Sequence, residues 1–244
     1  MDYPSNINIK LALPTSPLDS FMPLNSIEKA SIKDLVSLIK LIKEVASTRA
    51  GPPARFLKEH ALLALLTLSN SPLGRKSLAQ RLGLGEGSVR SLLKKLEAKN
   101  LLTSTRAGCQ ITEEGGRFVK IAQSVLVGPM RVRAGDLTVG AKDAAVLVRG
   151  GGAFVDSGLG VRDSAFRAGA DGATVLVVRE DGVYFPDGIK CPGELQEIAT
   201  SVAGLLNARE GDAVVIGTAQ TYTLAEVGAI AGALWIVERA IRGR

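Results

Sequence analysis

Residue types that often build functional sites are scarce in this chain of 244 residues, which has one histidine, two cysteines and 4% aromatic residues. The single histidine, His60, nearly excludes a metal site with imidazole ligands, so we expect no metal and no other cofactor. The simplest prediction for His60 is an ordinary position in a helix. Cys109 and Cys191 belong to no paired motif. This excludes a disulfide framework and is typical of a cytoplasmic protein.

Long apolar runs are also missing. No stretch of about 18 uncharged apolar residues has the flanks of a membrane span. The strongest candidate, Val227 to Val237, is rich in Gly and Ala and predicts a buried helix. The first residues, "MDYPSNINIK", lack the basic and apolar regions of a signal peptide. We therefore expect no membrane partner. Hydrophobic residues nevertheless make up 46% of the chain, which is enough for a folded core.

Positive charge is concentrated in the first half of the chain. Residues 1–128 carry 18 Lys and Arg against 10 Asp and Glu, whereas residues 129–244 carry 12 against 14. A basic half joined to a slightly acidic half predicts two tasks, one of which faces a polyanion.

Composition and periodicity divide the chain into four parts. They are a flexible lead-in (1–25), an amphipathic helix (26–50), a compact helical domain (51–128) and a second domain (129–244). In the amphipathic helix, Ile and Leu recur at helical spacing and form one apolar stripe. Gly51 and two prolines end that helix. Because this break separates it from the domain that follows, we expect the stripe to contact a second copy of the chain.

The third part alternates helical and turn signals in a definite order. We predict a helix at 57–69, a second opening at Ser77, a third at about 86–99, a hairpin around "RAG", and a final helix after "ITEEGG". Ser77 and Gln80 match the capping-box pattern, in which each side chain satisfies a backbone donor at the helix start. The order helix, helix, helix, hairpin, helix is that of a winged helix-turn-helix.

The third of these helices has two unlike faces. Val89, Leu92, Leu93 and Leu96 form a core stripe, while the opposite face is small and basic. A helix of this kind fits the major groove of DNA, where Arg and Ser reach base edges and Lys contacts phosphates. The candidate DNA-binding residues are Arg75, Lys76, Gly87, Arg90, Ser91, Lys94, Lys95 and Arg106. The alternative is a solvated basic face on a winged helix that contacts proteins.

The stretches "SLAQRLGLGEGSVRSLLKKLEAKNLL" and "ITEEGGRF" resemble the winged helix-turn-helix module of many prokaryotic regulators. The resemblance covers about 70 residues. It implies double-stranded DNA as a partner. Operators are usually bound by two-fold dimers, so we expect a homodimer, through the amphipathic helix or through the last helix of the chain.

The second domain is predicted as strand, helix, strand, strand, helix, strand, helix. We expect a two-layer α/β domain, with a ferredoxin-like arrangement as the first choice, so that the whole chain is of mixed α/β (α+β) class. Thr223 and Glu226 match a capping box at the start of the last helix. That helix is apolar on most of its circumference, and Gly228 and Gly232 allow close packing.

No catalytic motif is present in the second domain, and we expect no enzymatic activity. Its glycine-rich loop "RGGGAFVDSGLGVRD" offers backbone amides between two arginines, a combination suited to an anionic small molecule. The candidate ligand-binding residues are Arg149, Gly150, Gly151, Gly152, Gly158, Gly160, Arg162 and Asp163. The alternative is a structural turn whose arginines pair with Asp156 or Asp163.

The winged helix together with "GLGVRDSAFRAGADGATVL" resembles an uncharacterised family of archaeal regulators with a C-terminal domain of unknown function. This resemblance implies transcription regulation. We therefore expect a DNA-binding regulator with a small-molecule sensing domain. The alternatives are an enzyme acting on a small phosphorylated or carboxylated metabolite with an appended winged helix, and a protein-interaction scaffold.

Overall fold

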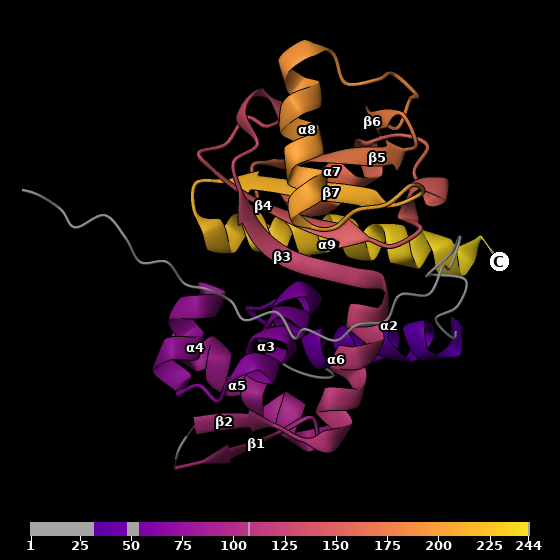
Figure 1. Ribbon diagram of the computed structural model, residues 1–244. Helices are drawn as coiled ribbons and strands as arrows, with labels where there is room; N and C mark the ends of the chain where they lie inside the picture. Colours follow the sequence, from indigo (N-terminus) through magenta and orange to yellow (C-terminus); the bar gives the residue numbers. More distant parts are fainter. Residues whose placement is uncertain (1–31, 48–53, 107, 244) are drawn as a thin grey trace, which may run out of the picture.

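The computed structural model describes residues 32–47, 54–106 and 108–243 (Figure 1). The lead-in (1–25), the start of the amphipathic helix and the break at Gly51 lie outside the described residues. The elements of the N-terminal half are α2 (Ile32–Ala46), α3 (Lys58–Asn70), α4 (Arg75–Leu82), α5 (Glu86–Ala98), β1 (Leu102–Thr105), β2 (Gly108–Ile111) and α6 (Glu113–Val125). Those of the C-terminal half are β3 (Leu126–Val132), η1 (Gly135–Leu137), β4 (Lys142–Val148), η2 (Gly151–Phe154), α7 (Leu159–Arg167), β5 (Gly172–Arg179), β6 (Gly182–Tyr184), α8 (Gly193–Leu205), β7 (Ala213–Ala219) and α9 (Tyr222–Arg242).

The N-terminal half has the predicted element order of a winged helix. The predicted core stripe of α5 is buried, with Leu92 and Leu96 fully enclosed. Burial of each such leucine stabilises the folded protein by roughly 1.5–3 kcal/mol relative to an exposed position. β1 and β2 form the predicted hairpin, and Leu73 exchanges two backbone hydrogen bonds with Cys109 of β2. The segment before α4 therefore lies beside the hairpin.

The predicted cap of the second winged-helix helix is wrong. α4 begins at Arg75, with Gly74 at its N-cap, so Ser77 already lies inside the first turn and caps nothing. At the other end Gly83 adopts a φ of +63°, a left-handed conformation that favours glycine and ends the helix. The turn between α4 and α5 thus has the predicted position.

The sheet of the C-terminal half has the strand order β3-β4-β7-β5-β6, and every neighbouring pair is antiparallel. β4 and β5 therefore run parallel with β7 between them, as in a split β-α-β unit. The ferredoxin-like prediction is wrong in one respect: the inserted strand is the last one, β7, and not the hairpin partner β6. The α+β class is as predicted.

The two-layer prediction is also wrong, because helices cover both faces of the sheet (Figure 1). Ala145 and Leu147 of β4 pack in a cluster with α8, while Val146 and Val148 pack in the larger cluster with α9. Both faces of β4 and β7 are buried, so hydrophobic residues follow one another without the alternation of a two-layer sheet. A Cβ at Gly217 of β7 would stand 2.3 Å from the Ala225 carbonyl oxygen, so α9 lies directly on the strand.

One continuous apolar core joins the two halves. α6 runs directly into β3, and the expected domain boundary at residues 128–129 falls inside that strand. The stripe of α2 is buried by the chain itself: Leu35 and Ile42 are fully enclosed, and α2 contacts α3, α6 and α9. The stripe therefore does not need a second copy of the chain to cover it. Its apolar character is then no reason to expect a dimer contact at α2.

The last helix begins one residue before the predicted cap. Thr221 is the N-cap of α9, and its hydroxyl oxygen accepts a hydrogen bond from the Leu224 amide. Thr223 lies inside the helix, so the predicted capping box with Glu226 is wrong. Gly228 and Gly232 do pack closely: added Cβ atoms would meet Ala170 Cβ at 2.5 Å and Val161 Cγ1 at 2.7 Å.

Candidate functional site

The outward face of α5 carries the predicted small and basic residues. Gly87, Arg90, Ser91 and Lys94 are all exposed. Neither Arg90 nor Lys94 has an ion-pair partner within the described ranges. The Ser91 hydroxyl already makes one hydrogen bond, because it donates to the Gly87 carbonyl oxygen at 3.1 Å. The two cations of this face therefore have their full charge available to a partner.

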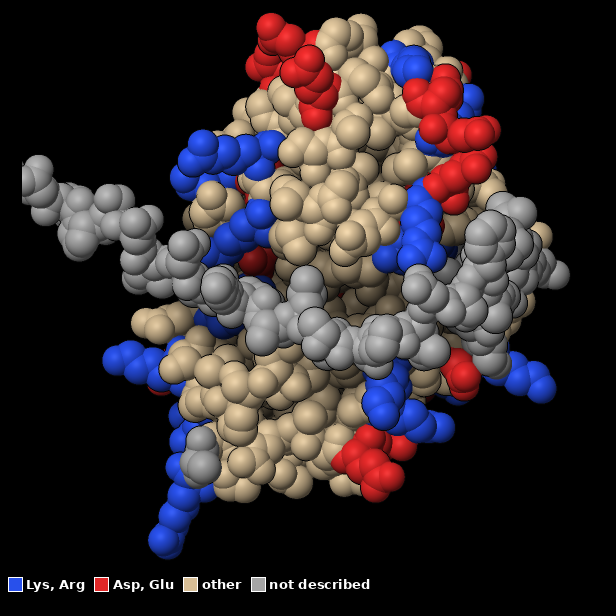
Figure 2. All heavy atoms as spheres, viewed as in Figure 1, with Lys and Arg blue, Asp and Glu red and all other residues tan. Residues whose placement is uncertain are grey.

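Arg75 and Arg106 meet at one hollow of about 470 Å³, although they are far apart in sequence. The backbone pairing of Leu73 with Cys109 causes this, since it holds the start of α4 against the hairpin. Lys76 is exposed in the same turn of α4. Figure 2 shows Lys and Arg side chains gathered along the edge of the N-terminal half on which α4 and the hairpin tip lie.

Lys95 does not belong to this surface. Its ammonium group donates to the Ser47 carbonyl oxygen and lies 5.2 Å from the centre of the Phe56 ring. It is half-buried, unlike Lys94 beside it. The wheel position of Lys95, at the flank of the basic face, did not reveal that α2 ends beside it. Lys95 therefore joins helices within the protein.

The helix-turn-helix is bound to α9 by contacts that the sequence did not reveal. Glu226 is 3% exposed, and its carboxylate accepts hydrogen bonds from Arg81 of α4 and from Arg131 of β3, the latter at 3.3 Å. Gly83 lies against Thr223, whose Cγ2 would stand 3.0 Å from an added Cβ. The available signal was an acid in the apolar first part of the helix, because a buried carboxylate requires a cation.

The glycine-rich loop already holds an anion, the carboxylate of Asp212. It accepts hydrogen bonds from Arg149 Nη1 at 2.7 Å, from the Gly150 amide at 2.8 Å and from the Arg209 amide at 2.9 Å. Asp212 is 4% exposed. Two of the predicted residues, Arg149 and Gly150, therefore donate to an anion, together with Arg209, which was not predicted; that anion is the side chain of Asp212 and not a ligand. Whether the loop also binds a ligand stays a prediction.

The other glycines of this loop make room for close packing. A Cβ at Gly151 would lie 2.9 Å from Val148, one at Gly152 would lie 2.9 Å from the Gly211 carbonyl oxygen, and one at Gly160 would lie 2.2 Å from the Trp235 ring. Gly158 is the N-cap of α7 and makes no such contact closer than 3.7 Å.

The two charged residues after this loop are exposed. Arg162 and Asp163 face each other at 4.0 Å, and their side chains are about half exposed. An exposed pair of this kind contributes little to stability. Asp156, the other acid considered for these arginines, pairs with Arg239 at 2.6 Å.

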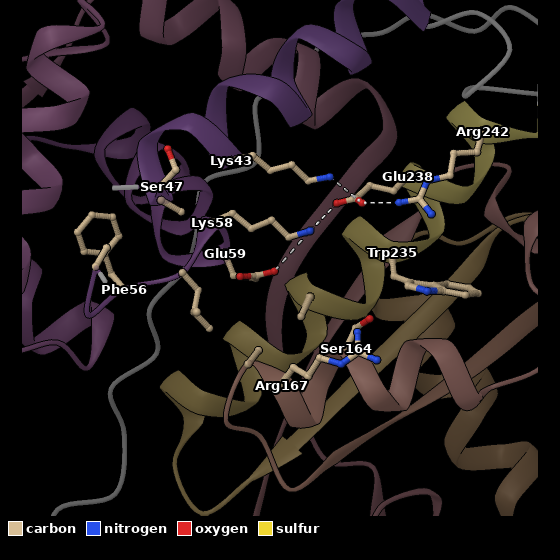
Figure 3. A pocket seen from close by; sticks show the side chains of 15 residues that line it. Lys43, Ser47, Phe56, Lys58, Glu59, Ser164, Arg167, Trp235, Glu238 and Arg242 are labelled. Atoms are coloured by element: carbon tan, nitrogen blue, oxygen red, sulfur yellow. Dashed lines mark hydrogen bonds and ion pairs between the residues drawn. The ribbon is translucent and has the colours of Figure 1, made fainter. Parts of the chain in front are cut away.

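An interdomain cleft of about 670 Å³ lies between the N-terminal half and helices α7 and α9 (Figure 3). Lys58 and Glu59, at the start of α3, form one wall, and Arg167 of α7 with Trp235 and Glu238 of α9 form the other. None of these residues was predicted to belong to a site. The available signal was the single tryptophan, set in a helix with acids and arginines near its end.

Two carboxylates in this cleft have shifted pKa values. Burial opposes ionisation of Glu238, but hydrogen bonds from Lys58 and Lys43 outweigh it and lower the pKa of Glu238. Lys43 lies 3.0 Å from it. Glu59 is buried with less compensation, and burial raises its pKa. The cleft therefore contains one carboxylate that is well paired and one that is not.

The described residues contain no helix that combines the length and the apolarity needed to cross a membrane. Nor do they bring three His, Cys, Asp or Glu side chains together in an arrangement that could hold a metal ion.

Comparison with known proteins gives two family matches. Residues 59–117 match the "PH0730-like, N-terminal domain", and residues 139–237 match a "Domain of unknown function (DUF4443)". Among solved structures, the chain is similar to "Hypothetical protein PH0730 from Pyrococcus horikoshii OT3". Identity is 30% and the TM-score is 0.61, over 75% of this chain and 94% of that one. No curated protein matches the chain.

Proposed function

This chain belongs to the PH0730-like family, and on that premise we propose that it is a DNA-binding transcription regulator with a C-terminal domain that senses a small molecule. The names of the two matching families describe no activity, so the proposal rests on the surface of the winged helix. We assign no catalytic role to the C-terminal domain.

The observation that carries the proposal is the exposed cationic surface formed by α5, the start of α4 and the hairpin. We name it the basic surface, and it comprises Arg75, Lys76, Arg90, Lys94 and Arg106. None of these five has an ion-pair partner in the part of the chain that the structure describes. The ammonium group of Lys95, by contrast, is hydrogen-bonded within the protein, to the Ser47 carbonyl oxygen. Unpaired cations on a helix narrow enough for the major groove are suited to phosphates and base edges.

A protein-binding role for the same surface is less well supported. Interfaces between proteins are depleted in Lys at their centre and enriched in aromatic side chains. The hollow between Arg75 and Arg106 has no aromatic residue in its lining, which is Gly74, Arg75, Ser104, Thr105, Arg106, Gly108 and Cys109. Its composition therefore favours a polyanion.

The test is selection of duplex DNA from random or genomic fragments, followed by binding measured over a range of salt concentrations. Arg90→Ala should weaken binding to the selected sequence by roughly 1–3 kcal/mol if it contacts a base. Lys94→Ala should weaken binding to all sequences and reduce the salt slope by about one. Lys40→Ala on α2 removes the same charge from an exposed position outside the basic surface and should change neither quantity.

Failure of the full chain to retard any fragment at low salt would reject DNA binding. Equal effects of Lys94→Ala and Lys40→Ala would show instead that only net charge matters.

Binding as a homodimer is part of the proposal, because two winged helices on one operator gain affinity that one lacks. Neither α2 nor α9 offers a free apolar stripe for the contact. We therefore expect pairing through other surfaces, or only on DNA.

A further inference from the structure

The interdomain cleft has an incompletely paired acid on one wall. The Glu59 side chain is 7% exposed, yet its nearest cation, Lys58 Nζ, is 4.0 Å away. Lys58 is itself bonded to Glu238. No side chain of the described residues donates a hydrogen bond to the Glu59 carboxylate. Burial of a carboxylate without a close partner is unfavourable, and a cationic group in the cleft would relieve it.

The opposite wall has a cation without an acid. Arg167, at the C-terminal end of α7, lines the cleft and has no ion-pair partner among the described residues. Figure 3 places Arg167 and Ser164 across from Lys58 and Glu59. The remaining cations, Lys43, Lys58 and Arg242, all lie within 3.5 Å of Glu238.

Trp235 of α9 lines the same wall of the cleft as Arg167, and its indole is half-buried. Its ring edge packs on the Gly160 backbone, and its N–H has no hydrogen-bond partner in the described part of the chain. Ala168 and Ala231 add small apolar surfaces. The cleft therefore combines one incompletely paired acid, one arginine without an ion-pair partner among the described residues, and an aromatic wall.

We propose that the interdomain cleft binds a small zwitterionic molecule, an amino acid or close relative. Its ammonium group contacts Glu59, its carboxylate contacts Arg167 and its apolar part lies on Trp235. The volume of about 670 Å³ is within the range of about 300–1,000 Å³ that holds small ligands. This site differs from the glycine-rich loop, and its ligand carries no net charge.

The position of the cleft suggests what the ligand controls. α9 contributes Trp235 and Glu238 to the cleft, and at its other end Thr223 and Glu226 contact the helix-turn-helix. A ligand that shifts α9 therefore shifts the turn that precedes α5. This coupling rests on the proposed DNA binding, whereas ligand binding itself does not.

The test uses the fluorescence of Trp235, which reports on the cleft alone because the chain has one tryptophan. The full chain is titrated with each protein amino acid except tryptophan and tyrosine, and with ε-aminocaproate. At least one should give a saturable change. The deaminated acid and the decarboxylated amine of that compound should each bind at least about tenfold more weakly, since each loses one charge contact.

Two variants then assign the contacts. Glu59→Gln should weaken the zwitterion about tenfold and leave the deaminated acid unchanged. Arg167→Met should weaken the zwitterion similarly and leave the decarboxylated amine unchanged. Arg133→Met is the control, an exposed arginine that follows β3 outside the cleft and outside the glycine-rich loop, and should have no effect.

No saturable response to any of these compounds overturns the proposal, as does a deaminated acid that binds as tightly as its zwitterion. The analogue series uses the unaltered protein and remains decisive if a variant fails to fold. DNA binding is measured separately. A fluorescence response without DNA binding supports the ligand site and rejects the proposed function. DNA binding without a fluorescence response rejects only the ligand site.

Discussion

Gly83 and Thr223 lie in direct contact, although 140 positions separate them: an added Cβ at Gly83 would stand 3.0 Å from Thr223 Cγ2. Gly83 is in the turn of the helix-turn-helix, and Thr223 is in the first turn of α9. α9 has 21 residues and is thus about 30 Å long. A single helix therefore extends from the helix-turn-helix of the N-terminal half to the interdomain cleft.

Glu226→Gln should destabilise the fold. The carboxylate is almost fully buried and pairs with Arg81 and Arg131, so an uncharged amide leaves both arginines without their acid. Both arginines are partly exposed, which reduces the loss to about 1–3 kcal/mol. Urea denaturation measures it. If the free energy of unfolding is unchanged, the pairs do not hold α4 to α9.

Gly160→Ala should destabilise the C-terminal half by about 1–3 kcal/mol, because the new methyl group would collide with the Trp235 ring. Elsewhere in a helix the same change usually stabilises. Gly158→Ala, where the nearest atom is 3.7 Å away, is the matched control and should be close to neutral. Thermal unfolding and Trp235 fluorescence test both. A neutral Gly160→Ala would contradict the packing described.

His60 predicts a loss of stability in acid. Burial lowers its pKa from 6.5 to about 4, and its Nδ1 accepts the Leu57 amide hydrogen bond at 3.1 Å. Between these pKa values the unfolded chain binds a proton that the folded protein does not. Stability therefore falls as pH drops from 6.5 to about 4, by roughly 3 kcal/mol in total from this group.

His60→Gln should remove this part of the pH dependence while keeping the cap, because Gln at this position also accepts from the N-cap amide. Denaturation at several pH values compares the variant with the parent. Identical pH profiles would contradict the prediction.

Asp212→Ala should expose the latent anion site of the glycine-rich loop. Arg149 and the amides of Gly150 and Arg209 lose their acceptor, and we expect a destabilisation of about 2–4 kcal/mol. Formate, which supplies a carboxylate, should restore part of it in the variant and do nothing for the parent. Equal response of the two proteins to formate would contradict this account.

Removal of residues 1–49 should unfold the protein and not merely separate subunits. The deletion eliminates α2, whose Leu35, Leu38 and Ile42 belong to the core. Three such side chains contribute roughly 5–9 kcal/mol, which is comparable with the total stability of a small protein. Circular dichroism decides between loss of structure and a folded product, and light scattering gives the oligomeric state of the full chain.

Local patterns predicted the winged-helix elements, because the α5 stripe and the turns at Gly83 and "RAG" depend on neighbours in sequence. Long-range partners were not predictable in the same way. Nothing near Lys95 indicates Ser47, and nothing near Arg149 indicates Asp212. The prediction of the strand order was wrong for the same reason, since unbroken apolar strands such as β7 fit several positions in a sheet. Glu59 and Trp235 were missed because only the fold brings α3 beside α9.

The insertion of β7 between β4 and β5 has a consequence for how the protein is made. During synthesis the winged helix leaves the ribosome first, followed by β4, β5 and β6. Until β7 emerges, β4 and β5 have no shared neighbour, and one side of each presents unpaired backbone groups. α9, which holds the helix-turn-helix turn through Thr223, follows later still. A nascent chain therefore exposes its N-terminal half well before the helix that contacts the helix-turn-helix arrives.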